Sequence, residues 1–311
     1  MQSKTVSVVM ATYNGERYIR EQLNSIIAQT YPIHELIIQD DCSKDSTVGI
    51  CREYEAKYPF VHLYINNQNL GFNDNFRTAV MHTTGDYVAI SDDDDVWFPE
   101  KIAKQVAAIG DHTMCYSQHL RGESIEKSRM VDYKNAPERH MFKAVVGHSM
   151  LLEREFIQDE TTWPGTLGYD IWLTALANFR KGIVHIEEPL NWHRTHDGQA
   201  SENTSERRPS VWKPYIYGWR EYRRLQKTRG WNLFYSRILA ESRGKNPLTQ
   251  KMSELLLCKS PLALFKLCCL CHKHRATVYP SDRIYGVMGH VRSFFFPLIH
   301  AYYSTDFYGI D

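Results

Sequence analysis

Hydrophobic residues in the first ninety positions alternate between short β-branched runs and longer segments with helical spacing. Residues 5–12 are almost continuously apolar and predict a buried strand, whereas residues 16–29 carry apolar side chains three or four positions apart and predict a helix. The pattern predicts further strands at residues 36–38, 61–65 and 87–90, and further helices at residues 45–57 and 73–82. This alternation predicts an α/β fold with a mostly parallel sheet flanked by helices.

The pattern changes twice further along the chain. Between residues 114 and 187 it is mixed, with strands predicted at 145–152 and 183–186 and a helix at 169–180. From about residue 205 the segments are helical, basic and rich in aromatic residues. We therefore predict an α/β domain over residues 1–204 and a mainly helical region over residues 205–311.

Charge follows the same division. Residues 1–204 contain 19 Lys and Arg against 29 Asp and Glu, while residues 205–311 contain 18 against 7, so the two parts favour different partners. The seven cysteines are odd in number and form no disulfide framework, which favours a reducing compartment. Because the apolar runs are too short for a signal peptide or a membrane span, we expect neither.

Polar residues follow three of the predicted strands directly. They are Thr12-Tyr13-Asn14, Asp40-Asp41 and the segment from Ser91 to Asp95. Ligands of open parallel sheets bind outside the carboxyl ends of the strands, so we expect these three segments to meet at one edge of the sheet.

Four consecutive carboxylates, Asp92 to Asp95, repel one another unless a counter-charge is present. Mn²⁺ or Mg²⁺ together with a diphosphate supplies that charge. The alternative is a solvated acidic turn that precedes a helix near Pro99. Asp41 can accept the N–H of a pyrimidine or a ribose hydroxyl, although an N-cap role, which Ser43 or Asp45 can also fill, remains open.

Taken in order, several segments resemble the family 2 glycosyltransferases of the GT-A (Rossmann-like) fold, in particular the bacterial rhamnosyltransferase-like enzymes of surface polysaccharide synthesis. The resemblance covers about residues 5–200, and the ordered set is more specific than any one piece. The segments are Val8 to Asn14, Gln29-Thr30-Tyr31, Ile37 to Thr47, Asn69-Leu70-Gly71 and Asp92 to Trp97.

The resemblance implies a nucleotide-sugar half at about residues 1–112 and an acceptor half at about 113–204. It also implies a metal-bound diphosphate, with Asp94 on the metal. Because Asp93 stands where relatives often carry Gln, the individual roles of the carboxylates stay open. The implied donor-binding residues are Ala11, Thr12 and Asn14 around the nucleotide, Asp41 at the base, Asn69 and Gly71 in a donor-side loop, and Asp92 and Asp93 near the ribose and diphosphate.

Two later segments match the acceptor side of the family. Asp170 opens a predicted helix where the family carries its catalytic base, although a lone Asp at a helix start also acts as a cap. Pro189 to His196 resembles the segment that closes the site, with Arg194 or His196 reaching the diphosphate or the metal, while a solvated surface position stays open for His193. Gly147 to Met150 resembles an acceptor-lining segment, or else marks a β-bulge.

The tail mixes Arg and Lys with Trp and Tyr, which suits an anionic membrane surface. Ordinary packing on the catalytic domain is the alternative, and we expect no nucleic acid partner. Residues 268–274 carry three Cys and two His in a run that lacks the separated pairs of a structural zinc site, so we expect buried thiols on a helix.

The sequence as a whole predicts a metal-dependent, inverting glycosyltransferase with Mn²⁺ or Mg²⁺ as cofactor. It would transfer a sugar from a UDP- or dTDP-linked donor to a saccharide acceptor, lipid-linked in this family, on the cytoplasmic side of the cell membrane. Two alternatives remain at this stage. One is a nucleotidyltransferase that makes sugar nucleotides, whose Gly-rich basic loop is replaced here by Thr12 to Gly15. The other is a catalytically inactive scaffold or binding module.

Overall fold

The computed structural model describes residues 4–131, 135–196, 212–279 and 285–304, which belong to two compact units. The first unit contains residues 1–133, 145–163 and 180–196, and the second contains residues 134–144, 164–179 and 197–311. Two segments that precede residue 204 therefore group with the tail. The predicted division of the chain at residue 204 stays a prediction.

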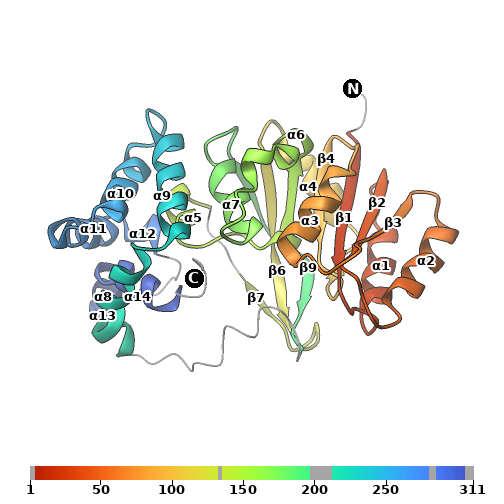
Figure 1. Cartoon of the computed structure of the whole chain (residues 1–311), viewed down its shortest axis with the longest axis horizontal. Helices are drawn as coiled ribbons and strands as arrows, with labels where there is room; N and C mark the ends of the chain where they lie inside the picture. Colours follow the sequence, from red (N-terminus) through yellow and green to blue (C-terminus); the bar gives the residue numbers. More distant parts are fainter. Residues whose placement is uncertain (1–3, 132–134, 197–211, 280–284, 305–311) are drawn as a thin grey trace. The chain divides into compact units, whose positions relative to one another are not determined.

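The first unit is built on a mixed sheet. Among the described residues this sheet has nine strands, in the order β3-β2-β1-β4-β8-β6-β9-β5, with β7 paired to β6 (Figure 1). β1 pairs in parallel with β2 and β4, β2 with β3, and β6 with β9, whereas β5, β7 and β8 pair antiparallel. The strands are β1 (Val6–Thr12), β2 (Glu35–Asp40), β3 (Val61–Ile65), β4 (Tyr87–Ser91), β5 (Val96–Trp97), β6 (Met114–Gly122), β7 (Arg129–Val131), β8 (Met150–Glu153) and β9 (Ile183–Arg194).

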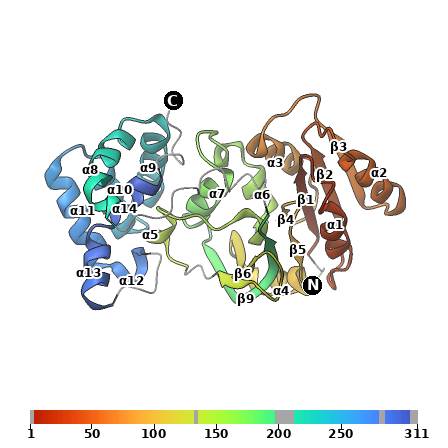
Figure 2. The ribbon, with the colours of Figure 1, turned by 90° about the horizontal axis from the view of Figure 1, so that it is seen from below.

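Helices cover both faces of the parallel part of this sheet, and Figure 2 shows α1 and α3 on opposite sides of β1. Leu23 of α1 packs with Val8 and Leu36 in one buried cluster. Because successive side chains of a strand alternate, Val9 faces the other side, on which α3 contacts β1. The α-helices of this unit are α1 (Ile19–Ile27), α2 (Thr47–Lys57), α3 (Phe72–Met81), α4 (Lys101–Ile109) and α6 (Arg154–Gln158). The predicted α/β fold with a largely parallel sheet is confirmed.

Two strands of the middle region differ from the prediction. The strand predicted to begin at residue 145 begins at Met150, because Gly147–Ser149 forms a 3₁₀ turn. The strand predicted to end at residue 186 continues to Arg194. Its pairing with β6 shifts register beside Pro189, so the irregular pairing admits a residue that cannot donate a backbone hydrogen bond.

The second unit is helical over its described residues. An aromatic cluster fills its interior: the ring of Trp231 lies 5.5 Å from that of Tyr222 and 4.6 Å from that of Tyr235, and Trp172 lies 5.2 Å from Phe234. The predicted helical C-terminal region is therefore confirmed. The helices are α5 (Pro137–His140), α7 (Tyr169–Ala177), α8 (Lys213–Leu225), α9 (Arg229–Ser242), α10 (Pro247–Leu257), α11 (Pro261–Lys273), α12 (Arg275–Val278), α13 (Gly286–Phe294) and α14 (Phe296–Tyr303).

Two predictions made for the tail concern membrane-spanning segments and the run of cysteines at residues 268–271. No helix in the described ranges has the length and apolarity needed to cross a membrane. In α11, Cys268 and Cys271 are buried and Cys269 is exposed. Burial raises the pKa of the Cys268 thiol to about 12, so this side chain behaves as an apolar core residue.

Candidate active site

The turns that follow β1 and β2 are tied together by hydrogen bonds. The backbone N–H of Asn14 donates to Ser43 Oγ (2.9 Å), and Asn14 Oδ1 accepts from the N–H of Lys44 (2.8 Å). The N–H of Gly15 donates to Thr47 Oγ1 (2.8 Å). Asn14 has a positive φ of 54°, a conformation that Asn tolerates better than most residues. The N–H of Asp41 also donates to the Thr12 carbonyl oxygen (2.9 Å), so the predicted segments after β1 and β2 meet at one edge of the sheet.

Asp41 holds the loop at residues 69–71 against this edge. Its Oδ1 accepts from the N–H of Leu70 (2.7 Å) and its Oδ2 from the N–H of Gly71 (2.8 Å). Asn66 Nδ2 also donates to Oδ1 (2.8 Å), and Asn69 Nδ2 lies 3.3 Å from the Asp41 carbonyl oxygen. The predicted residues Asp41, Asn69 and Gly71 are thus in contact, with Asp41 organising the loop. Direct binding of a base by Asp41 stays a prediction.

Asp93 connects the acidic segment to the turn after β1. The Thr12 hydroxyl donates to Asp93 Oδ2 at 2.6 Å, and a Cβ atom placed on Gly15 would lie only 2.3 Å from the same oxygen. Burial, followed by the charge of Asp94, raises the pKa of Asp93 to about 7. Because Gly15 has no side chain, the Asp93 carboxyl can approach the backbone closely at this turn. Burial and the charge of Asp94 both disfavour the ionised form of this carboxyl. Ala11, also predicted to line the nucleotide, is the one β1 residue that is not buried.

Asp94 lies beside the segment that follows β9. His196 Nε2 is 2.9 Å from Asp94 Oδ2, and Arg194 Nε donates to the Asp94 carbonyl oxygen at 3.0 Å. The Arg194 guanidinium lies over the rings of Tyr18 (4.5 Å) and Trp192 (4.3 Å). The two residues predicted as metal ligands, Asp94 and His196, are thus within hydrogen-bonding distance, although 102 positions separate them in the chain.

A buried group of histidines adjoins the acidic segment, and the sequence reasoning missed it. Asp95 Oδ1 lies 3.0 Å from His193 Nδ1, and its Oδ2 lies 3.4 Å from His148 Nδ1. The two imidazole rings stack with centroids 4.7 Å apart. Burial raises the pKa of Asp95, opposed by the His193 hydrogen bond, and burial lowers the pKa of His148. The open alternative of a solvated His193 is wrong, since this residue is paired with a buried carboxylate.

These residues fit a divalent cation. Asp94 and His196 offer one carboxylate oxygen and one imidazole nitrogen at a partly exposed position. Next to them, ligand atoms of Asp92, Asp95, His148 and His193 lie within 4.8 Å of one another. Carboxylate oxygens suit Mn²⁺ and Mg²⁺. Burial, followed by the charge of Asp94, raises the pKa of Asp93, and a cation would offset the repulsion between these two carboxylates.

Asp170 belongs to the second unit, where it begins α7. Its Oδ1 accepts from the N–H of Ile171 (2.9 Å), and a Cβ atom on Gly168 would lie 2.6 Å from this oxygen. Burial raises the pKa of Asp170 to about 6, which favours a proton acceptor near neutral pH. The neighbouring aromatic residues Tyr169 and Trp172 are buried, so their role is in packing the helix.

The arrangement of the sheet defines the class of protein. Residues 1–349 of S. aureus TarS, solved in complex with UDP-GlcNAc, match 97% of this chain and 90% of that chain, with a TM-score of 0.57 and 17% identity. The mannosyltransferase PcManGT from Pyrobaculum calidifontis, solved in complex with GDP-Man and Mn²⁺, covers 98% of this chain and 88% of its own, with a TM-score of 0.54 and 18% identity. The fold is therefore that of the GT-A glycosyltransferases.

Sequence comparison identifies the family. The model for glycosyl transferase family 2 matches residues 7–168, slightly more than half of the chain, and the chain belongs to that family. The dTDP-rhamnosyl transferase RfbG from Shigella flexneri is 36% identical over 117 residues, which are 36% of this chain and 40% of RfbG. The chain spans 34–44% of the length of the curated relatives that match it at 34–41% identity. The predicted resemblance is confirmed.

Proposed function

We propose that this protein transfers a sugar, with inversion, from a UDP- or dTDP-linked donor to a saccharide acceptor in surface polysaccharide synthesis. The observation that carries the proposal is the contact between Asp94 and His196 beside the turn after β1. A dTDP-rhamnosyl transferase among the relatives, and fold neighbours solved with UDP-GlcNAc and GDP-Man, support a nucleotide-sugar donor. Membership of a glycosyltransferase family also favours transfer over the alternative synthesis of sugar nucleotides.

The donor would lie along the carboxyl ends of β1, β2 and β4. Ala11, Thr12 and Asn14 would line the nucleotide, with Asp41 and its loop closing over the base. Asp92 and Asp93 would bind the ribose and diphosphate. Arg194, held over two aromatic rings, would place its positive charge near the diphosphate.

Asp94 and His196 would hold Mn²⁺ or Mg²⁺. The cation supplies electrostatic stabilisation of the charge that grows on the leaving diphosphate. The buried Asp95 and His193 pair anchors the end of β9 to the acidic segment, which keeps His196 close to Asp94. This network behind the ligands orients them, as partners of metal-binding residues commonly do.

Asp170 would accept the proton of the acceptor hydroxyl as that oxygen attacks the sugar. Its pKa of about 6 keeps it ionised at neutral pH and yet basic enough to take a proton. Its carboxylate accepts a hydrogen bond from the Ile171 N–H, which fixes its orientation at the start of α7.

The acceptor is proposed to be lipid-linked, with α8 lying on the anionic inner surface of the cell membrane. The large apolar side chains of Trp212 and Ile216, at the start of α8, are 68% and 67% exposed. Arg220 and Arg223 lie on the same helix and stack on Tyr217 and Trp219. Mixed cationic and aromatic side chains of this kind suit a membrane interface.

The proposal is tested by the release of nucleoside diphosphate from UDP-, dTDP- and GDP-sugars in the presence of Mn²⁺, with and without a membrane extract as the source of acceptor. We expect one donor class to be consumed by the wild-type protein, and its consumption to fall in D94N and D170N. No release above the protein-free background by the wild type with any donor would favour the inactive scaffold, and release that is equal in the wild type and both variants would contradict the roles of Asp94 and Asp170.

A further inference from the structure

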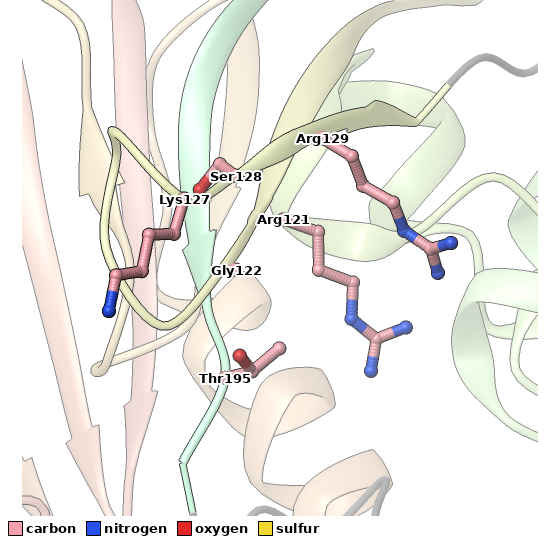
Figure 3. Close-up of a pocket in the computed structure, with 6 residues that line it drawn as sticks. All are labelled: Arg121, Gly122, Lys127, Ser128, Arg129 and Thr195. Atoms are coloured by element: carbon pink, nitrogen blue, oxygen red, sulfur yellow. The ribbon is translucent and has the colours of Figure 1, made fainter.

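A polar pocket lies in the first unit, beside the end of β9. Its volume is about 450 Å³, within the usual range for a small ligand. It is formed by the hairpin of β6 and β7 and by the residue after β9, as Figure 3 shows. The lining residues are Arg121, Gly122, Lys127, Ser128, Arg129 and Thr195.

Two arginines face each other in this hairpin. Arg121 on β6 and Arg129 on β7 are direct partners in the antiparallel register, and their guanidinium groups extend in the same direction (Figure 3). Like charges placed directly opposite one another destabilise a strand pair. Lys127 adds a third positive charge to the lining. Among the described residues, none of these three side chains has a carboxylate ion-pair partner within 4.0 Å.

The pocket adjoins the proposed metal site through the chain itself. Thr195 lines the pocket, and its N–H donates to the Gly122 carbonyl oxygen at 3.0 Å. The residues on either side of it, Arg194 and His196, both contact Asp94. Successive side chains of an extended segment face opposite ways, so the pocket and Asp94 lie on opposite sides of the same short stretch of chain.

From this geometry we infer that the pocket binds an anionic group, a phosphate or a carboxylate, carried by the acceptor. Two arginine side chains that extend in the same direction offer guanidinium donors to the paired oxygens of such an anion. The donor diphosphate is assigned to the Asp94 side, so an anion in this pocket belongs to the other substrate. The inference rests on the proposed transferase function and makes it more specific: the acceptor carries a negatively charged group.

Calorimetric titration with inorganic pyrophosphate in EDTA, at low ionic strength, tests the pocket without the acceptor. We compare the wild type with R121Q/R129Q, with D94N, and with R52Q/K57Q, which removes two positive charges from exposed positions on α2. Pyrophosphate binding should weaken by at least about tenfold in R121Q/R129Q, because charged hydrogen bonds are lost. It should be unchanged in R52Q/K57Q, whereas weaker binding in D94N would place the pyrophosphate at the donor site and overturn the inference. Equal binding by all four proteins would overturn the inference.

Two further binding experiments distinguish the possible sources of the anion. They also distinguish a failure of the pocket proposal from a failure of the donor-site proposal. Binding of UDP with Mn²⁺ should be unchanged in R121Q/R129Q, and its loss there would assign the pocket to the donor and overturn the inference. Vesicles of phosphatidylglycerol should bind wild type and R121Q/R129Q equally, and weaker binding by the variant would assign the arginines to the membrane surface instead. If no protein binds UDP, the donor proposal fails, and the pyrophosphate result still reports on the pocket.

Discussion

Replacement of Gly15 by alanine tests the contact between the turn after β1 and the acidic segment. The new Cβ would lie 2.3 Å from Asp93 Oδ2 and 3.1 Å from Thr12 Oγ1, closer than packed atoms approach. Because Gly15 does not have a positive φ, the backbone accepts alanine, and the clash is relieved by moving the Asp93 side chain. That movement breaks the 2.6 Å hydrogen bond from Thr12 to Asp93.

The expected cost follows from that bond. At a pH above about 8, where Asp93 is ionised, a hydrogen bond to its carboxylate contributes about 1.5–3 kcal/mol. If the donor complex needs Asp93 in its present position, nucleotide affinity should fall by about 10- to 150-fold, since 1.4 kcal/mol corresponds to a factor of ten. Alanine restricts the unfolded chain and returns about 0.4–1 kcal/mol, so the free energy of unfolding should fall by about 0.5–2.6 kcal/mol.

The assay is calorimetric titration with UDP and dTDP in Mn²⁺, alongside chemical unfolding in urea. Gly49→Ala is the matched control, because Gly49 is exposed on α2 and a Cβ there meets no atom within 4 Å. Wild-type nucleotide affinity in Gly15→Ala would refute the reasoning, and so would a loss of affinity as large in Gly49→Ala.

Three further predictions concern the base, the metal ligand and the membrane surface. Asp170 must be ionised to accept a proton, so kcat/KM should fall about tenfold per pH unit below about 6. D170N should lose activity by about 10²- to 10⁴-fold while its nucleotide affinity stays unchanged. His196→Ala should weaken Mn²⁺-dependent UDP binding by at least about 10- to 100-fold, measured by Mn²⁺ titration. That is the factor lost when an outer-shell partner of a metal ligand is removed, and a direct ligand should matter no less. R220Q/R223Q should bind phosphatidylglycerol vesicles about 30-fold more weakly in co-sedimentation, because each lost charge removes about 1 kcal/mol. A kcat/KM that stays constant down to about pH 4 would contradict the first prediction. Mn²⁺-dependent UDP binding that is unchanged in His196→Ala would contradict the second, and vesicle co-sedimentation that is unchanged in R220Q/R223Q would contradict the third.

The first half of the sheet could be predicted from the sequence because its signals are local. β3 has the predicted bounds of residues 61–65, and β1 and β4 differ from the prediction by one residue at one end each. The parallel alternation then places the residues after β1, β2 and β4 at one edge without knowledge of any side-chain contact. This is why the meeting of Asn14 and Ser43 was foreseeable.

The network behind the acidic segment could not be predicted in the same way. The Asp95 and His193 contact joins residues 98 positions apart, and it depends on β9 continuing well past its apolar start. Glu187 and Glu188 within β9 interrupt the apolar pattern, so the sequence marks only the beginning of that strand. Similarly, Gly15 reads as an ordinary turn glycine until its closeness to Asp93 is seen.

The central claim is that Asp94 takes part in metal-dependent binding of a nucleoside diphosphate. Calorimetric titration of the wild-type protein and Asp94→Asn with UDP, dTDP and GDP, each with and without Mn²⁺, tests it most directly. The account predicts that the wild type binds UDP or dTDP only when Mn²⁺ is present, and that Asp94→Asn loses this binding. Binding that is the same in both proteins, or that does not depend on Mn²⁺, would contradict it.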